Sequence, residues 1–161
     1  MAINNRTQLA PVGVDYILVA SKFRLSPPSP LFLSLFVANH TDKSQVRRKG
    51  FAISNTSIGS HLLIRSEQEI IYRSDPFAAA ITPAFNHKLP IVVPSHSELE
   101  LAEWNIMEME FETAQADHHG EHQKRMLVDM ITPGQYTVEW NDGELMDNLP
   151  GISNRVAFVV C

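Results

Sequence analysis

Apolar residues recur at every second position in several stretches of the chain, which is the period of a β-strand with one buried face. Residues 14–20 form the first such stretch, with an apolar face made of Val14, Tyr16, Leu18 and Ala20. Residues 31–39 give the strongest strand prediction, since both faces are apolar: Leu31, Leu33, Leu35 and Val37 on one, Phe32, Phe36 and Ala38 on the other. Such a strand is expected to be central and covered on both sides, or to form part of an interface.

Shorter strands are predicted between turn residues, at 51–53, 61–64, 69–73, 89–93, 126–131 and 155–160. Residues 66–68 are expected to close a hairpin between two of them. The proline-rich stretch 26–30 cannot continue a hydrogen-bonded ladder, because proline has no backbone N–H, and is expected to carry the chain between sheets. Residues 76–90 are apolar but irregular, and we expect them to lie across an open end of the fold.

Residues 95–112 fit either a strand or a helix. As a strand, they show two runs of alternation separated by a break at 103–106, which indicates a β-bulge. As a helix, Ser95 or Ser97 with a glutamate three residues later would form a capping box, and many of the residues are good helix formers. The alternation favours the strand, because the apolar residues would spread around a helix.

A Pro-Gly turn at 133–134 feeds a further strand, whose inner face is predicted to hold Tyr136, Val138 and Trp140. Tyr136 is placed to form a tyrosine corner, in which the ring packs beside the core and the hydroxyl bonds to backbone upstream. The outward residues Thr137 and Glu139 show nothing unusual. The strand is expected to end at the turn signal Asn141-Asp142-Gly143.

Many short strands with turns between them and little convincing helix predict an all-β fold, an antiparallel β-sandwich of about eight strands. The length of 161 residues suits a single domain over 1–161, with residues 1–11 as a loose N-terminal lead-in. With 44% hydrophobic and 19% charged residues, the composition is that of an ordinary globular protein. The longest apolar runs are far shorter than the ~20 residues of a membrane helix, so we expect no membrane span.

The formal net charge of −5 disfavours nucleic acid as a partner, because proteins that bind nucleic acid usually present a basic face. The one basic cluster, Lys43, Arg47, Arg48 and Lys49, is interpreted as a solvated turn. The single cysteine, Cys161, has no partner for an intramolecular disulfide. No signal peptide is visible, so a cytoplasmic location is expected if the N-terminus is native.

The one cluster of metal-ligating residue types is Asp117-His118-His119-Gly120-Glu121-His122. His118 and His122 have the i, i+4 spacing of a helical zinc, copper or nickel site, but Gly120 disfavours a helix and no second cluster supplies further ligands. The alternative is a flexible, solvated hairpin tip within residues 113–125. We expect no cofactor, and a metal only if these histidines bind one.

No catalytic motif is present, neither a G-x-S-x-G elbow, a P-loop nor a G-x-G-x-x-G sequence, so we expect a protein that is not an enzyme. Six outward-alternating glutamates are interpreted as the solvent face of a strand, or as a face for a basic partner: Glu98, Glu100, Glu103, Glu108, Glu110 and Glu112. Trp104 falls at the break in the alternation and is a candidate surface platform for a ligand.

The sequence Thr132-Pro133-Gly134-Gln135-Tyr136-Thr137-Val138 resembles the penultimate strand of many immunoglobulin-like domains. Together with 33–39 and 94–101, it is similar to small sandwiches of the intracellular proteinase-inhibitor type. The resemblance implies an immunoglobulin-like fold and a role other than catalysis. The long excursion at 103–130 departs from the compact pattern of those domains, and the resemblance assigns no inhibitory residues.

Three functions remain open. The first is a protein-binding module that recognises a partner through end loops, with candidate loops 113–125 and 142–153. Its candidate binding residues are Trp104, Asp117, His118, His119, Glu121, His122, Asn141 and Asp142. The second is a structural subunit of a self-associating assembly, such as a filament or shell, and the third is a metal-binding protein that uses the histidines of 117–122.

Overall fold

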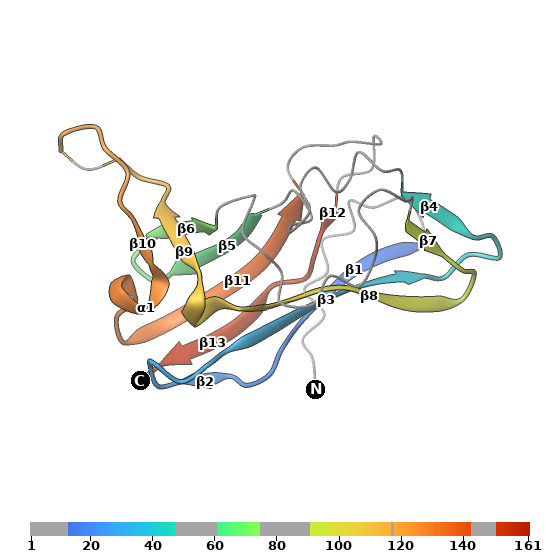
Figure 1. The fold of residues 1–161 in the computed structure, drawn as a ribbon, viewed down its shortest axis with the longest axis horizontal. Coiled ribbons are helices and arrows are strands. Elements are labelled where there is room, and N and C mark those ends of the chain that lie inside the picture. The colour runs from blue at the N-terminus through green and yellow to red at the C-terminus, as the bar shows by residue number, and fades with distance from the viewer. Residues whose placement is uncertain (1–12, 48–60, 75–90, 117, 143–150) are drawn as a thin grey trace.

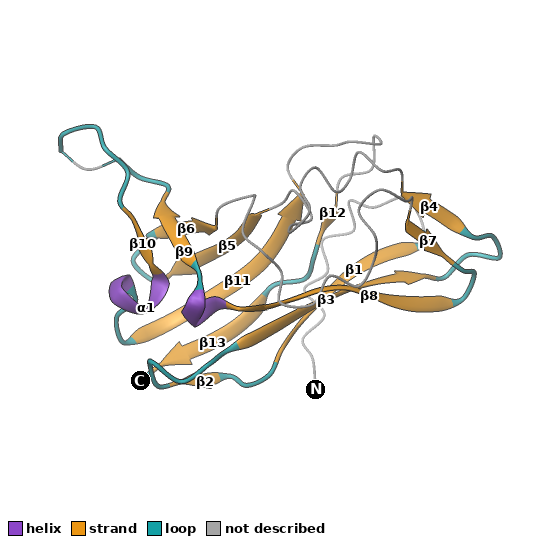
Figure 2. Ribbon diagram, in the orientation of Figure 1, coloured by secondary structure: helices purple, strands orange, loops and turns teal. Residues whose placement is uncertain are grey.

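The structure is a computed structural model that describes residues 13–47, 61–74, 91–116, 118–142 and 151–161. It is built almost entirely of strands, which confirms the all-β prediction (Figure 2). The strands are β1 (Val14–Ala20), β2 (Arg24–Leu25), β3 (Phe32–Asn39), β4 (Gln45–Arg47), β5 (His61–Ser66), β6 (Ile71–Ser74), β7 (Ile91–Val93), β8 (Ser97–Asn105), β9 (Glu110–Thr113), β10 (Lys124–Met126), β11 (Gly134–Asp142), β12 (Gly151–Ile152) and β13 (Val156–Val160). In the described part of the chain two single turns are helical: η2 (Ile106–Glu108), a 3-10 turn, and α1 (Leu127–Met130).

Two sheets face each other across one hydrophobic core (Figure 1). The first sheet has the order β1-β3-β8 and is antiparallel throughout. The second sheet has the order β10-β9-β6-β5-β11-β13-β2, with β12 paired to β11. A separate two-stranded ribbon joins β4 to β7. The predicted strands at 51–53 and the segment 76–90 lie outside the described residues.

The doubly apolar strand β3 is central in the first sheet, as its sequence predicts. Its inner face is fully buried at Leu33 and Leu35, whereas Phe32 and Phe36 on its outer face are only half-buried. Residues 26–30 connect β2 in the second sheet to β3 in the first, which confirms the predicted crossing between sheets. The outer face of the first sheet is therefore the less covered side of this strand.

Residues 97–105 and 110–113 form strands, joined by the single 3-10 turn η2, so the strand interpretation is confirmed over most of this stretch. The break in alternation is a β-bulge, but it lies earlier than expected: Phe36 pairs with Glu100 and Leu35 pairs with Ala102, which leaves Leu101 as the extra residue. Beyond the bulge the chain passes through η2 and enters the second sheet as β9.

The strand predicted at 126–131 is wrong for most of its length, because only Met126 belongs to β10 and the next four residues form α1. The backbone N–H of Leu127 donates to the carbonyl of Met109, and that of Ile131 donates to the carbonyl of Leu127. This turn places Leu127 in the core with no exposed surface. A short apolar run does not by itself distinguish a buried helical turn from a strand.

Tyr136 forms the predicted tyrosine corner. Its hydroxyl donates to the Thr132 carbonyl at 2.6 Å and accepts from the Thr132 backbone N–H at 3.2 Å. Its ring stacks on Phe158 with a centroid separation of 5.6 Å. The hydroxyl therefore fixes the turn that starts β11, and the residue is structural.

Alkaline pH is expected to destabilise the protein through Tyr72, whose pKa is raised above 10.0 mainly by burial and also by the nearby Tyr136. A folded-state pKa above that of the unfolded chain gives a contribution to stability that is complete below about pH 10 and is lost as the pH rises through the folded value. Tyr72→Phe removes the titrating group, so its unfolding free energy should fall less between pH 9 and 11. Urea denaturation across that range tests this, and parallel curves for the two proteins would contradict it.

Candidate functional site

The hairpin of β9 and β10 forms one end of the second sheet. The loop that connects these two strands extends away from the body of the protein (Figure 1). The base of the loop is held on both sides. Across the hairpin, the Thr113 N–H donates to the Gln123 carbonyl at 2.9 Å. Toward the body, the Ala114 N–H donates to the Ile71 carbonyl at 2.8 Å, and the Gln115 side chain bonds to the backbone of Glu69 and Ile71.

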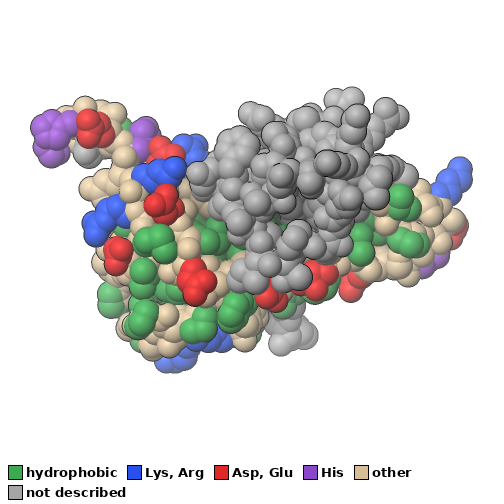
Figure 3. Space-filling model, in the orientation of Figure 1, with side chains coloured by type: hydrophobic (Ala, Val, Ile, Leu, Met, Phe, Trp, Pro, Cys, Tyr) green, Lys and Arg blue, Asp and Glu red, His purple; other side chains and the backbone are tan. Residues whose placement is uncertain are grey.

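The predicted polar tip at 113–125 is confirmed in its described part, and histidine side chains lie both at the end of the loop and near its base (Figure 3). The rings of His118 and His119 are exposed, with centroids 4.0 Å apart. His122 lies at the base, where its Nδ1 is 2.8 Å from the Thr113 carbonyl oxygen. Gly120 turns the chain with φ of +78°, a conformation that L side chains rarely adopt.

The metal-site hypothesis stays a prediction. Among the described residues, no group of three or more histidine, cysteine, aspartate or glutamate side chains is arranged to hold a metal ion. His118 and Glu121 are both exposed in the tip, while His122 bonds to backbone at its base. Asp117 lies outside the described residues.

Three other candidate residues are not where the sequence placed them. Trp104 is buried, with 4% of its surface exposed, and so is not a surface platform. The bulge at Leu101 resets the alternation and turns Trp104 into the core, opposite Leu33. Asn141 and Asp142 lie within β11 and not in a loop, because β12 pairs with both and β5 pairs with Asn141, which extends the ladder beyond the expected turn.

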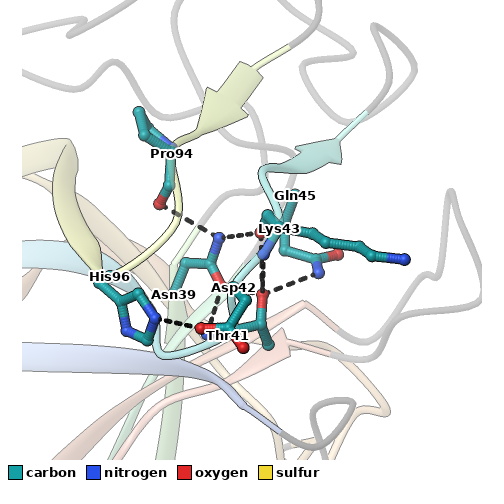
Figure 4. Close-up of polar contacts among 7 residues, drawn as sticks. All are labelled: Asn39, Thr41, Asp42, Lys43, Gln45, Pro94 and His96. Carbon is teal, nitrogen blue, oxygen red and sulfur yellow. Dashed lines mark hydrogen bonds and ion pairs between the residues drawn. The ribbon is translucent and has the colours of Figure 1, made fainter.

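At the end of the first sheet where β3 ends and β8 begins, the buried side chain of Asn39 joins two turns (Figure 4). Its Nδ2 faces three carbonyl oxygens, those of Lys43 at 2.8 Å, Val93 at 3.0 Å and Pro94 at 3.1 Å. Its Oδ1 accepts from the backbone N–H of Thr41 at 2.9 Å and from the Thr41 hydroxyl at 2.7 Å. The sequence predicts the turn that follows Asn39. It does not predict that the carbonyl groups of Val93 and Pro94, which lie far along the chain, accept hydrogen bonds from the Asn39 side chain.

Two exposed histidine–aspartate pairs flank this cluster. His96 Nε2 lies 2.7 Å from Asp42 Oδ1, and His40 Nε2 lies 3.2 Å from Asp15 Oδ2. The His96–Asp42 pair again connects the turn after β3 to the turn before β8 (Figure 4). The polar residues at this end satisfy one another, which makes the cluster a structural joint and not a binding pocket.

Glu139 is a buried carboxylate on the outer face of the second sheet, with only 4% of its surface exposed. It pairs with Arg65 on β5 and with Arg155, whose Nε lies 3.4 Å from Glu139 Oε2. This cluster could not be predicted from the sequence, because the two arginines come from segments far apart along the chain. The arrangement neutralises a buried charge and leaves both arginines partly exposed.

The alternating glutamates separate onto two faces. Glu98, Glu100 and Glu103 lie on the outer face of the first sheet, whereas Glu110 and Glu112 lie on β9 in the second sheet. Glu112 is 3.8 Å from Arg73, but the three glutamates of β8 form no ion pair with any described residue. Glu98 and Glu100 are exposed, so the outer face of the first sheet has an acidic edge.

A scan against models of protein families gave no match, and a search of curated protein sequences gave none either. Within the described residues, no helix is long and apolar enough to cross a membrane.

Proposed function

We propose that the protein is a non-enzymatic binding module, an immunoglobulin-like β-sandwich that recognises a protein partner through the loop between β9 and β10. The observation that carries the proposal is the fixed base and exposed tip of that hairpin. Ala114 and Gln115 hold the base against β6, while His118, His119 and Glu121 are exposed beyond it.

A loop held in this way suits recognition for a thermodynamic reason. Ordering a mobile loop on binding costs free energy, and a loop whose ends are already fixed by hydrogen bonds has less of that cost to meet. The tip also offers chemically varied groups, imidazole rings beside a carboxylate, which can form directional contacts with a partner. Tyr136 at its corner and Trp140 in the core support the immunoglobulin-like part of the proposal.

Replacing residues 116–121 by Gly-Ser-Gly is expected to abolish partner binding while leaving the fold intact, because the contacts of Thr113, Gln115 and His122 are kept. The intact protein is first used to capture a partner from an extract of the cells that produce it. The purified partner is then titrated by biolayer interferometry against the intact protein and the variant. We expect the dissociation constant to rise at least about tenfold in the variant.

A matched control replaces Glu67 and Gln68, in the exposed turn between β5 and β6, by Asn-Gly. This variant should bind the partner as the intact protein does. Equal affinity of the partner for the tip variant and the intact protein would contradict the proposal, as would the absence of any saturable protein ligand. Thermal unfolding of both variants checks that they remain folded.

A further inference from the structure

The outer face of the first sheet has an open hollow at one end. It is lined by Val19, Ala20, Ser21, Phe32, Ser34 and Glu103. Val19 is 48% exposed, and the register places Val19, Ser34 and Glu103 side by side across the three strands. The rim is fixed, because the Ser21 N–H donates to the Phe32 carbonyl and the Phe32 N–H donates to the Ser21 hydroxyl.

An exposed aromatic residue lies beside this hollow. Phe23 is 65% exposed and follows Ser21 by two residues, so their Cα atoms are within about 7.6 Å of each other. The Phe23 carbonyl accepts from the Val159 N–H at 2.8 Å, and Leu25 is fully buried. The backbone that presents Phe23 is therefore anchored on the body of the protein, although its side chain is solvated.

The charges around these two features are opposite in sign. Phe23 lies between Lys22 and Arg24, and the hollow lies beside Glu100 and Glu103 on β8. None of these four charged side chains forms an ion pair with another described residue. One patch thus combines an apolar projection with basic neighbours and an apolar hollow with acidic neighbours.

We propose that this patch, residues 19–24 with Phe32, Ser34, Glu100 and Glu103, is the interface of a twofold symmetric dimer of this chain. The Phe23 ring of each copy occupies the hollow of the other, and Lys22 and Arg24 of each copy face Glu100 and Glu103 of its partner. A twofold interface uses the same surface on both copies and must be complementary to itself, and this patch contains both halves of each contact.

The net negative charge of the protein favours a contact between two copies in which basic side chains of one face acidic side chains of the other. Each copy carries a formal net charge of −5, so two copies repel unless their contact brings opposite charges together. Placing Lys22 and Arg24 against the glutamates of β8 does so twice in one dimer. Because the twofold contact closes on itself, assembly stops at two copies.

The test uses two charge-reversed variants of the full chain, Lys22→Glu/Arg24→Glu and Glu100→Arg/Glu103→Arg. Sedimentation velocity of the unchanged protein is expected to show a concentration-dependent monomer–dimer equilibrium. Each variant alone faces like charges across the interface, and its dimer dissociation constant should rise at least about tenfold. An equimolar mixture of the two variants restores opposite charges at both contacts and should form a 1:1 dimer.

Phe23→Ser tests the apolar contact without burdening the fold, since the side chain is exposed in the monomer, and it should weaken the dimer at least about tenfold as well. Glu67→Arg/Glu110→Arg matches the charge change of the glutamate variant at two exposed positions outside the patch and should dimerise as the unchanged protein does. A spin label on Cys161, the one cysteine of the sequence, should give a single distance in the dimer and none in the separate variants. A protein that stays monomeric up to 300 µM, variants that dimerise unchanged, a mixture that stays monomeric or an assembly larger than two would each overturn the proposal.

Discussion

Asn39→Ala is expected to lower the free energy of unfolding by about 3 kcal/mol, because it leaves several buried or partly buried polar groups without a partner. The substitution removes the donor that faces the carbonyl oxygens of Lys43, Val93 and Pro94. It also removes the acceptor for the backbone N–H and hydroxyl of Thr41. Water can replace some of these contacts at the more exposed positions, which keeps the cost below the sum of separate penalties.

Urea denaturation followed by circular dichroism measures this loss, and Asn105→Ala is the matched control. Asn105 is also a buried asparagine, 7% exposed, but among the described residues its side chain makes one hydrogen bond, which it accepts from the Met107 N–H at 3.2 Å. Its replacement should cost about 1 kcal/mol. If Asn39→Ala costs no more than Asn105→Ala, the cluster around Asn39 does not hold the two turns together.

Asn39→Asp keeps the shape of the side chain but replaces its hydrogen-bond donor by an acceptor, so it tests the donor alone. At neutral pH the new carboxylate would face three carbonyl oxygens, so the substitution should be at least as costly as Asn39→Ala. Carbonyl oxygens favour the protonated acid, which can donate, and so hold the pKa of this aspartate above its unfolded value. The variant should therefore regain stability relative to the original protein as the pH falls through that raised pKa.

The strands that the sequence predicts well are those whose pattern is local. β1 was predicted with its observed bounds, and β3 within one residue, because alternation over seven or eight residues specifies a buried face without reference to any partner. The tyrosine corner was predicted for the same reason, since Tyr136 bonds to Thr132 only four residues upstream. These features depend on neighbours along the chain.

The errors arise where a distant segment decides the outcome. Glu139 looks like an ordinary outward residue until β5 and β13 bring Arg65 and Arg155 beside it. Asn141 and Asp142 have a strong turn signal, but pairing with β12 extends the strand. Trp104 could be placed only once the bulge at Leu101 was known, and the position of a bulge depends on the register with β3.

The two candidate surfaces also combine features that a local pattern predicts with features that depend on contacts between distant segments. The polar tip of the hairpin was predictable from its composition, whereas the contacts of its base with Glu69 and Ile71 were not. The hollow on the first sheet is made by residues of three strands, and only their pairing brings Val19, Ser34 and Glu103 together. The stretch Lys22-Phe23-Arg24 was not singled out from the sequence, because the exposure of Phe23 depends on the anchoring of β2 against β13.

Trp140→Ala is expected to lower the free energy of unfolding by about 4 kcal/mol, because a large buried side chain would leave a cavity. The ring has no exposed surface and lies 5.0 Å from the ring of Tyr16, at an interplanar angle of 39°. Trp140 belongs to β11 in the second sheet and Tyr16 to β1 in the first. Loss of the Trp140 ring would therefore weaken the packing between the two sheets.

Trp140→Phe should cost much less, about 1–2 kcal/mol, for a reason specific to this position. The indole N–H of Trp140 is buried and has no hydrogen-bond partner among the described residues, so phenylalanine removes an unpaired donor along with some volume. Trp104 is also buried, with 4% of its surface exposed, but its indole N–H is not a fully buried group without a partner, so Trp104→Phe makes the same change in volume without that compensation. Urea denaturation of the three variants should rank Trp140→Phe as the mildest, and equal losses for Trp140→Phe and Trp104→Phe would mean that the indole N–H of Trp140 finds a partner in solution.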